Sequence, residues 1–190
     1  MIAKLFEIAE IKIGYTLRAS SANNTKKQAV GLVAAKDLDS NFENIGEISI
    51  SAKYDNFLKK GDILVKSRGN SATARVFNCD KNNCLAAATL LVARLKTKDF
   101  LPEYIALVIN NVRNQQLLKT VASSTLVPTL KPSSLKEIEI PVISLAEQER
   151  LIKEFSLITR TEDVLKQYLA NLQSIRTIMD NKFTEEQYGK

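Results

Sequence analysis

The last part of the chain, from Ser144 to about Phe183, contains no glycine or proline. One helix of about 40 residues and about 60 Å is therefore expected, which is longer than helices in globular domains usually are. An apolar residue recurs every seven positions at Leu151, Ile158, Leu165, Leu172 and Met179, and the stripe is widened by Phe155, Leu169, Tyr168, Ile175 and Phe183. A helix cannot bury such a face against itself, so the pattern predicts a partner helix in a coiled coil. Packing against the front part of the same chain is the alternative.

The start of this helix is indicated by Ser144-Leu-Ala-Glu147, which has the form of a capping box. In this motif the serine hydroxyl accepts a hydrogen bond from a free amide of the first turn, and the glutamate reaches back to another amide. The sequence thus predicts a globular domain over residues 1–143 and a dimerisation or spacer helix over residues 144–190.

The first half of the globular domain consists of short β-branched and aliphatic runs separated by polar turns, which is typical of a sheet. The expected strands are Glu10–Ile13, Val30–Ala34, Glu47–Ile50, Asp62–Lys66, Arg75–Asn78 and Leu85–Leu95. The last two look like a hairpin around the turn Asp80–Asn83. Because Leu85–Ala93 is nearly all apolar, we expect this strand to be central and covered on both faces.

The second half of the domain begins with a predicted helix from Pro102 to about Val121, since proline suits the first turn and apolar residues follow at helical spacing. Two prolines and a run of hydroxyl residues predict a loop over 123–133. A short strand is expected at Leu135–Pro141. Together these elements predict an α+β fold, a mixed α/β globular domain followed by a long coiled-coil helix.

Several kinds of chemistry are disfavoured by what the chain lacks. It has no histidine and only two cysteines, Cys79 and Cys84, which we interpret as thiols flanking a turn. The chain contains no glycine-rich nucleotide motif, no nucleophile elbow and no amino-methyltransferase motif. We therefore expect no catalytic residue, no metal site and no cofactor. Short apolar runs and a charged start predict a cytoplasmic protein without a membrane span.

Positive charge is concentrated in the front part of the chain. Residues 1–144 contain 20 lysines and arginines against 13 acidic residues, whereas residues 145–190 contain 7 against 8. Such a surplus favours nucleic acid as a partner, because cations replace the counterions of phosphates. Exposed loops rich in basic, amide and hydroxyl groups are candidates for contact with DNA. The candidate residues are Arg18, Lys26, Lys27, Lys66, Arg68, Asn70, Ser71, Arg75 and Lys131. Solvated surface charge, or for Arg68 a structural turn, is the alternative for each.

Six segments, taken in order, resemble the target-recognition half of a specificity subunit of type I restriction-modification systems. They are Leu5-Phe-Glu-Ile-Ala-Glu-Ile-Lys-Ile-Gly14, Leu58-Lys-Lys-Gly-Asp-Ile-Leu64 with Ser67-Arg-Gly69, Leu101-Pro-Glu-Tyr-Ile105, Val127-Pro-Thr-Leu-Lys131, Ile138-Glu-Ile-Pro141 and Ser144-Leu-Ala-Glu-Gln148. The likeness covers about residues 1–155, and the terminal helix resembles the spacer helix of that family.

This resemblance implies a non-catalytic, sequence-specific DNA-binding subunit onto which methyltransferase subunits, and in a restriction complex a restriction subunit, would dock. A full subunit of that family has two recognition domains and two long helices, each domain reading one half of a bipartite site. This chain has one of each, which implies either a half-subunit that forms a homodimer or a stand-alone relative. The dimerisation residues would be Leu151, Phe155, Ile158, Leu165, Leu169, Leu172, Ile175 and Met179.

The competing functions are a protein-interaction module that acts through its coiled coil without a specific DNA target, and an enzyme that acts through Asp, Glu or Lys. If the chain forms an antiparallel dimer, two-fold symmetry predicts a target of two inverted half-sites separated by unread base pairs.

Overall fold

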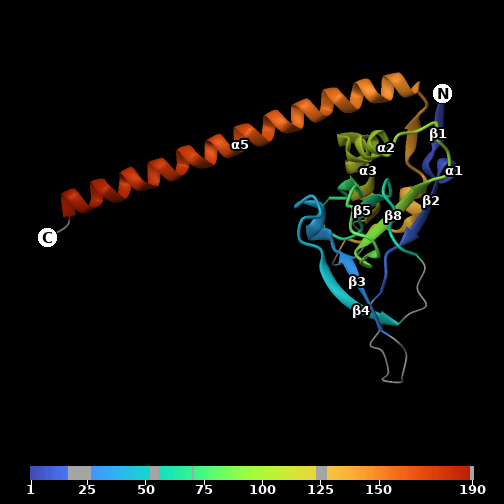
Figure 1. Cartoon of the computed structure of the whole chain (residues 1–190). Helices are drawn as coiled ribbons and strands as arrows, with labels where there is room; N and C mark the ends of the chain where they lie inside the picture. The colour runs from blue at the N-terminus through green and yellow to red at the C-terminus, as the bar shows by residue number, and fades with distance from the viewer. Residues whose placement is uncertain (17–26, 52–55, 70, 123–127, 189–190) are drawn as a thin grey trace. The chain divides into compact units, whose positions relative to one another are not determined.

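The computed structural model describes residues 1–16, 27–51, 56–69, 71–122 and 128–188 (Figure 1). The chain divides into two compact units, residues 1–149 and residues 150–190. The first unit mixes strands and short helices, and the second is the continuation of a single long helix. The predicted α+β class with a long terminal helix is therefore confirmed.

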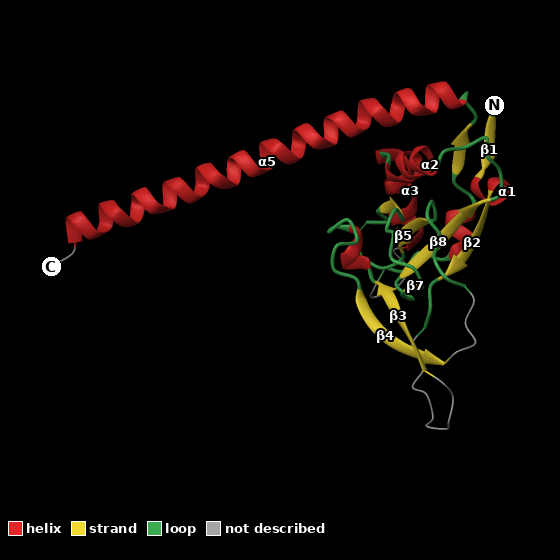
Figure 2. Cartoon of the chain, in the orientation of Figure 1, coloured by secondary structure: helices red, strands yellow, loops and turns green. Residues whose placement is uncertain are grey.

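The described residues of the first unit form three sheets, whose strands Figure 2 shows in yellow. A four-stranded antiparallel sheet has the order β2 (Ala9–Ile13), β8 (Leu90–Leu95), β5 (Ile63–Lys66) and β6 (Ala74–Val76). A three-stranded sheet has the order β4 (Gly46–Ser51), β3 (Lys27–Val33) and β7 (Cys84–Ala86), with β3 antiparallel to β4 and parallel to β7. The two ends of the unit are joined by an antiparallel pair of β1 (Ile2–Lys4) and β9 (Glu139–Pro141).

Where the structure describes the same unit, five helices belong to it or begin in it, together with one 3-10 turn. They are α1 (Leu5–Ile8), the 3-10 turn η1 (Ala35–Leu38), α2 (Pro102–Asn110), α3 (Val112–Ala122), α4 (Pro132–Lys136) and α5 (Leu145–Tyr188). Helix α2 packs against β5 and β6, and it contributes the fully buried side chains of Ile105 and Ile109. Helix α4 packs against β2 and α3.

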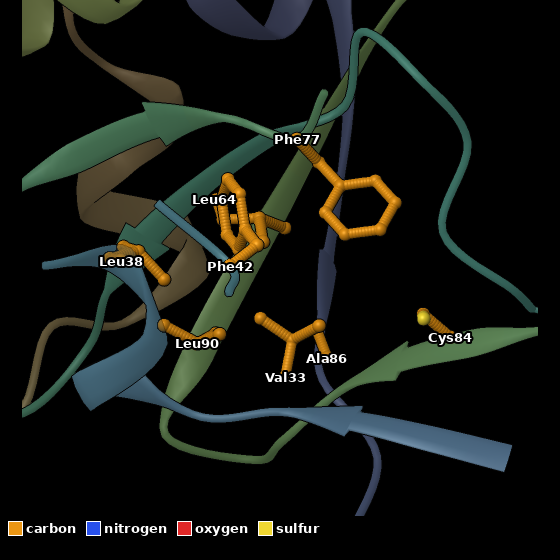
Figure 3. Packing of buried hydrophobic residues seen from close by; sticks show 8 residues of the cluster. All are labelled: Val33, Leu38, Phe42, Leu64, Phe77, Cys84, Ala86 and Leu90. Carbon is orange, nitrogen blue, oxygen red and sulfur yellow. The ribbon is translucent and has the colours of Figure 1, made fainter. Parts of the chain in front are cut away.

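One apolar cluster is built from both larger sheets (Figure 3). Its buried members are Val33, Leu38, Phe42, Leu64, Phe77, Cys84, Ala86 and Leu90. Phe42 and Phe77 meet edge to face with ring centroids 5.3 Å apart, which is a favoured aromatic geometry. Burial raises the pKa of the Cys84 thiol, so Cys84 behaves as a core residue rather than as a nucleophile.

The apolar run Leu85–Leu95 is not one strand, and the predicted hairpin with Arg75–Asn78 is wrong. The run is divided into β7 and β8, which belong to different sheets, and β6 pairs with β5 instead. The small residues Ala88 and Thr89 form the turn between the two strands, where Leu90 N–H donates to Ala87 O (2.9 Å). The expectation of a central strand is confirmed for β8, which lies between β2 and β5.

The predicted helix over 102–121 is interrupted at Asn111, and the predicted strand over 135–141 is too long. Asn111 has an extended backbone (φ −64°, ψ 153°), and its side-chain oxygen accepts a hydrogen bond from Asn114 N–H at 2.8 Å. Asn111 thereby caps the start of α3, which explains the break. Leu135 and Lys136 belong to α4, which begins at Pro132, so only Glu139–Pro141 forms a strand.

Helix α5 begins where the sequence predicts. Ser144 Oγ accepts a hydrogen bond from Glu147 N–H at 3.3 Å, which is the hydroxyl half of the predicted capping box. Gln148 is fully buried in the first turn. Its side chain accepts from Leu101 N–H (2.9 Å) and donates to the carbonyls of Asp99 (2.9 Å) and Ile143 (3.1 Å). Gln148 thus fastens the start of the helix to the first unit.

Gly14 lies where the backbone leaves β2 and passes close to the turn between β7 and β8. Gly14 N–H donates to Leu90 O (2.9 Å), and Tyr15 N–H donates to Ala86 O (2.6 Å). A Cβ atom on Gly14 would overlap the backbone carbonyl of Ala87. Because backbone atoms cannot rotate aside as a side chain can, this position requires glycine.

We therefore expect Gly14→Ala to lower the free energy of unfolding by about 1–3 kcal/mol, the usual cost of forcing atoms into a filled space. Urea titration followed by circular dichroism measures it. Gly46→Ala is the matched control, because a Cβ there meets nothing within 4 Å. It should change the stability by less than about 0.5 kcal/mol. Equal losses in the two variants would contradict the role given to Gly14.

Candidate nucleic-acid interface

Two of the predicted DNA-contacting loops lie side by side. Arg68 and Thr129 form an isolated antiparallel bridge. Next to it, Leu130 N–H donates to Ser67 O at 2.7 Å, and Gly69 N–H donates to Pro128 O at 3.3 Å. We call residues 66–69, 71–75 and 128–133 the paired-loop surface. Arg68 and Lys131 are exposed on it, and they come from segments about 60 positions apart in the sequence.

The loop after β5 is held in place by two amide side chains. Asn110, the last residue of α2, accepts a hydrogen bond from Ala74 N–H (2.8 Å) and donates to Ala74 O (2.9 Å). Gln115 of α3 does the same for Ala72, at 3.0 and 3.2 Å, and also donates to Ile109 O at 2.9 Å. Each amide thus satisfies both polar groups of one loop residue, as a neighbouring strand would. This loop is therefore part of the rigid domain at residues 71–75.

Two of the predicted phosphate contacts already have protein partners. Lys66 Nζ lies 2.9 Å from both carboxylate oxygens of Asp39, and its side chain is only 17% exposed. Arg75 Nε donates to Leu38 O at 2.9 Å. These bonds connect β5 and β6 to the segment around η1. Ser71 Oγ and Thr73 Oγ1 are 3.2 Å apart at the surface. Among the predicted cations, Arg68 and Lys131 are thus the better placed for an external ligand.

The other predicted contacts are described incompletely. Arg18, Lys26 and Asn70 lie outside the residues that the structure describes. Lys27 is the first residue of β3, opposite Ser51 of β4. The structure therefore brings together Lys66, Arg68, Ser71, Arg75 and Lys131 on neighbouring segments, and it neither supports nor opposes a role for the remaining candidates.

An ion pair between a buried carboxylate and a partly exposed arginine lies at the start of β5, at the opposite end of this strand from the paired-loop surface. Asp62 is 1% exposed and binds Arg94 of β8 through two hydrogen bonds of 2.7 Å, from Nε and Nη2. Asp62 also accepts from Lys59 N–H (2.8 Å), and Arg94 donates to Phe57 O (3.0 Å). The hydrogen bonds to Asp62 raise the pKa of Arg94. Because Asp62 faces away from solvent, we assign this ion pair a structural role.

Helix α5 carries an apolar face that nothing in the described part of the chain covers. The side chains of Leu165, Leu169 and Leu172 are 56%, 57% and 44% exposed. The opposite face is polar, with Lys153, Arg160, Gln167, Ser174 and Asn181 at seven-residue spacing. The predicted dimerisation residues Phe155, Ile158, Ile175 and Met179 are exposed as well, and Leu151 is half-buried.

Sequence reasoning missed Asn110, Gln115, Gln148 and the Asp62–Arg94 pair. The amides lie on helices whose apolar spacing was the dominant signal, and their partners are 36 to 49 positions away.

Within the described residues, no cluster of metal-ligating side chains is found. No helix among those residues is long and apolar enough to span a membrane.

The chain is thus a mixed α+β domain that carries the paired-loop surface and is followed by an apolar-faced helix of 44 residues. Comparison with known protein families identifies the family of this chain. Residues 1–174 match the type I restriction modification DNA specificity domain, and the chain belongs to this family. The predicted resemblance is thereby confirmed. No curated protein sequence matches the chain at a significant level.

Solved structures show the same fold. A chain from a structure on complex assembly and conformational transition of the type I R-M system superposes with a TM-score of 0.71, covering 98% of this chain and 45% of that one. The HsdS subunit from Thermoanaerobacter tengcongensis gives 0.62, with coverage of 100% and 50%. The type I restriction-modification S subunit from M. genitalium gives 0.57, with coverage of 99% and 46%. Each is 16% identical in sequence, and the chain spans about half the length of each.

Proposed function

We propose that this chain is a non-catalytic specificity subunit that reads one half of a bipartite DNA site and recruits methyltransferase subunits in the cytoplasm. Membership of the DNA specificity domain family supports DNA as the ligand. The observation that carries the proposal is the paired-loop surface, on which Arg68 and Lys131 are exposed and are fixed to a rigid domain. A restriction subunit is a further partner of the assembled complex.

The surface has the properties that duplex recognition requires. Arginine can bind both acceptors of a guanine edge, and lysine and serine can hold phosphate oxygens. Gly69 has φ +104°, a conformation that other residues adopt rarely, so it maintains the turn that exposes Arg68. Asn110 and Gln115 fix the backbone next to this turn, which lowers the entropy lost when the loop binds.

In this proposal the complete DNA-binding unit is a homodimer formed through α5. Its support is the apolar face of α5, which nothing in the described part of the chain covers. A two-fold dimer presents two identical paired-loop surfaces, so its target is two inverted copies of one half-site. The sequence of the base pairs between the two half-sites is not read, and only the number of these base pairs is constrained.

The test is selection of bound duplexes from a random library, with the methyltransferase subunits of the same system added if the chain alone binds weakly. We expect an inverted repeat with an unread centre. Affinity for the selected duplex should fall steeply with salt, because binding releases phosphate counterions. Binding without sequence preference would contradict the proposal and favour a protein-interaction module that acts through α5.

Within this test we expect Arg68→Ala to weaken binding to the selected duplex by about 1–3 kcal/mol, and to affect a scrambled duplex less. Arg113→Ala is the matched control, because Arg113 is an exposed arginine whose guanidinium lies 3.7 Å from Glu139 of β9. It removes the same charge and should leave discrimination unchanged. A melting curve accompanies both variants. If Arg68→Ala unfolds the domain, Arg68 serves the fold rather than the reading of bases.

A further inference from the structure

The segment that contains η1 lies over one face of the four-stranded sheet, next to the paired-loop surface. Side chains alternate along an extended chain, so Leu64, Lys66 and Arg68 fall on the same face. Leu38, the last residue of η1, belongs to the same apolar cluster as Leu64 (Figure 3). The next residue is Asp39, and both of its carboxylate oxygens lie 2.9 Å from Lys66 Nζ. An acidic side chain is therefore bound to the lysine two positions before Arg68, on the same face of the sheet.

The turn that carries Asp39 is fixed by its own contacts. Asp37 is 2% exposed, and its side chain accepts a hydrogen bond from Ala34 N–H at 2.7 Å. The backbone carbonyl of Asp37 accepts from Phe42 N–H at 3.0 Å. Phe42 has φ 66°, which is uncommon for a bulky residue, and its ring packs against Phe77 in the core. Because such a conformation persists only where the surroundings hold it, the position of Asp39 is set by the fold.

The exposed member of the ion pair is the acid. The side chain of Asp39 is 66% exposed, whereas that of Lys66 is 17% exposed. An ionised carboxylate has about four lone pairs that accept hydrogen bonds, and Lys66 uses one on each oxygen. The pair therefore presents hydrogen-bond acceptors to a ligand, while its two charges offset each other. It can approach a phosphate backbone without the repulsion that a lone carboxylate would meet.

The bases differ in what they offer to such an acceptor. In the major groove cytosine presents the amino group N4, and adenine presents the amino group N6 beside the acceptor N7. Guanine and thymine present acceptor oxygens and nitrogens there, which a carboxylate would repel. Adenine N7 would repel it as well, so a carboxylate suits cytosine best. Arg68, on the same face of the sheet, suits the two acceptors of guanine.

We infer that Asp39 reads a cytosine in the major groove by accepting a hydrogen bond from its N4 amino group, and that Lys66 positions the carboxylate. This inference rests on the proposed function and adds a specificity-determining residue next to the paired-loop surface. Lys66 is then a positioning residue rather than a phosphate contact. Each half-site contains a C·G pair whose recognition depends on Asp39.

Exchange of the acid for its amide tests the inference on the whole chain, by selection of bound duplexes from a random library as for the unmodified chain. Asp39→Asn keeps the size of the side chain and an oxygen that accepts from Lys66 Nζ, so the fold should be retained. The asparagine amide can both accept from adenine N6 and donate to adenine N7. We expect one base pair of the half-site to change from C·G to A·T, with the other positions unchanged.

Binding titrations give the size of the effect. For the unmodified chain, replacement of that C·G pair by T·A should weaken binding at least about tenfold, the usual scale for one mismatched base pair. Asp39→Ala should reduce this preference to within about threefold, because alanine cannot accept a hydrogen bond from the base. A melting curve accompanies each variant. If Asp39→Ala unfolds the domain, the comparison is made with Asp39→Asn, which keeps a partner for Lys66.

Asp80→Asn is the matched control. Asp80 is an exposed aspartate that also pairs with a lysine, since its Oδ1 lies 3.0 Å from Lys60 Nζ. Lys60 precedes β5, whereas the paired-loop surface follows the other end of this strand. The control removes the same charge from a similar ion pair, and it should leave the selected sequence and the preference for C·G unchanged.

The outcomes separate this inference from the proposed function. An Asp39→Asn chain that selects the same bases as the unmodified chain overturns the reading of cytosine, while sequence-specific DNA binding stands. Equal strengthening of binding to all duplexes also overturns it, because the carboxylate would then act only by repelling phosphates. An unmodified chain without any sequence preference overturns the proposed function, and this inference with it. A change from C·G to A·T that is seen with Asp39→Asn and absent with Asp80→Asn is the expected result.

Discussion

Replacing Arg94 by alanine should lower the free energy of unfolding of the first unit by about 3 kcal/mol, the usual scale for removing one partner of a buried ion pair. The residue left behind is Asp62, which is 1% exposed and would lose its cationic partner. Lys59 N–H still donates to Asp62, which limits the loss. For a unit of this size the melting temperature should fall by roughly 6–12 °C, measured by circular dichroism.

Two further variants identify the cause of this loss. Arg94→Lys keeps the charge but cannot form the two parallel hydrogen bonds to Asp62, so it should be intermediate. Lys60→Ala removes an exposed ion pair with Asp80, in which the two side chains are 66% and 92% exposed. It should shift the melting temperature by no more than about 1 °C. An Arg94→Ala variant as stable as Lys60→Ala would contradict the structural role of this pair.

The elements predicted correctly are those whose signals are local. The uninterrupted heptad pattern predicts α5, and Ser144 marks its start because a capping hydroxyl acts within one turn. The errors arise where partners distant in sequence decide the structure. The turn at Ala88 and Thr89 has no glycine or proline, and it exists because β7 pairs with β3 while β8 pairs with β2 and β5. The break at Asn111 is different, since asparagine at a helix start is a local signal.

In the candidate site, too, local features can be predicted from the sequence, whereas contacts between distant segments cannot. Composition identifies the loops around Arg68 and Lys131 as polar and basic, and both residues are exposed. Composition cannot show that the two loops pair through Arg68 and Thr129, or that Lys66 is bound to Asp39. Gln115 shows most clearly what the sequence does not reveal. A glutamine on a helix has the same sequence pattern whether its side chain is solvated or holds a loop 43 positions away.

Replacing Leu165 and Leu172 together by aspartate should convert the proposed dimer into a monomer. The change removes four leucines from the seam of the dimer, each worth about 1.5–3 kcal/mol when buried, and places charges there without partners. The dissociation constant should rise by at least about four orders of magnitude. Sedimentation velocity at micromolar concentration measures this, and far-ultraviolet circular dichroism shows whether the first unit remains folded.

The control places the same two charges on the polar face, as Gln167→Asp and Ser174→Asp. Both double variants introduce two aspartates, so a loss of helix caused by aspartate itself would appear in both. Only the seam variant should lose the dimer. A monomeric mass for both would attribute the effect to helix stability, and a dimeric mass for both would show that this face is not the interface.

The same two double variants test whether dimerisation allows the protein to recognise a bipartite site. In a dimer the second domain binds its half-site as an intramolecular event, so a duplex with two inverted half-sites should bind more tightly than one with a single half-site. The seam variant should bind both duplexes equally, with the affinity of a single half-site, because its paired-loop surface is unchanged. The polar-face variant should keep the preference for two half-sites. A monomeric seam variant that still prefers the inverted repeat would show that one domain reads both halves, and the two-fold model of recognition would then be wrong.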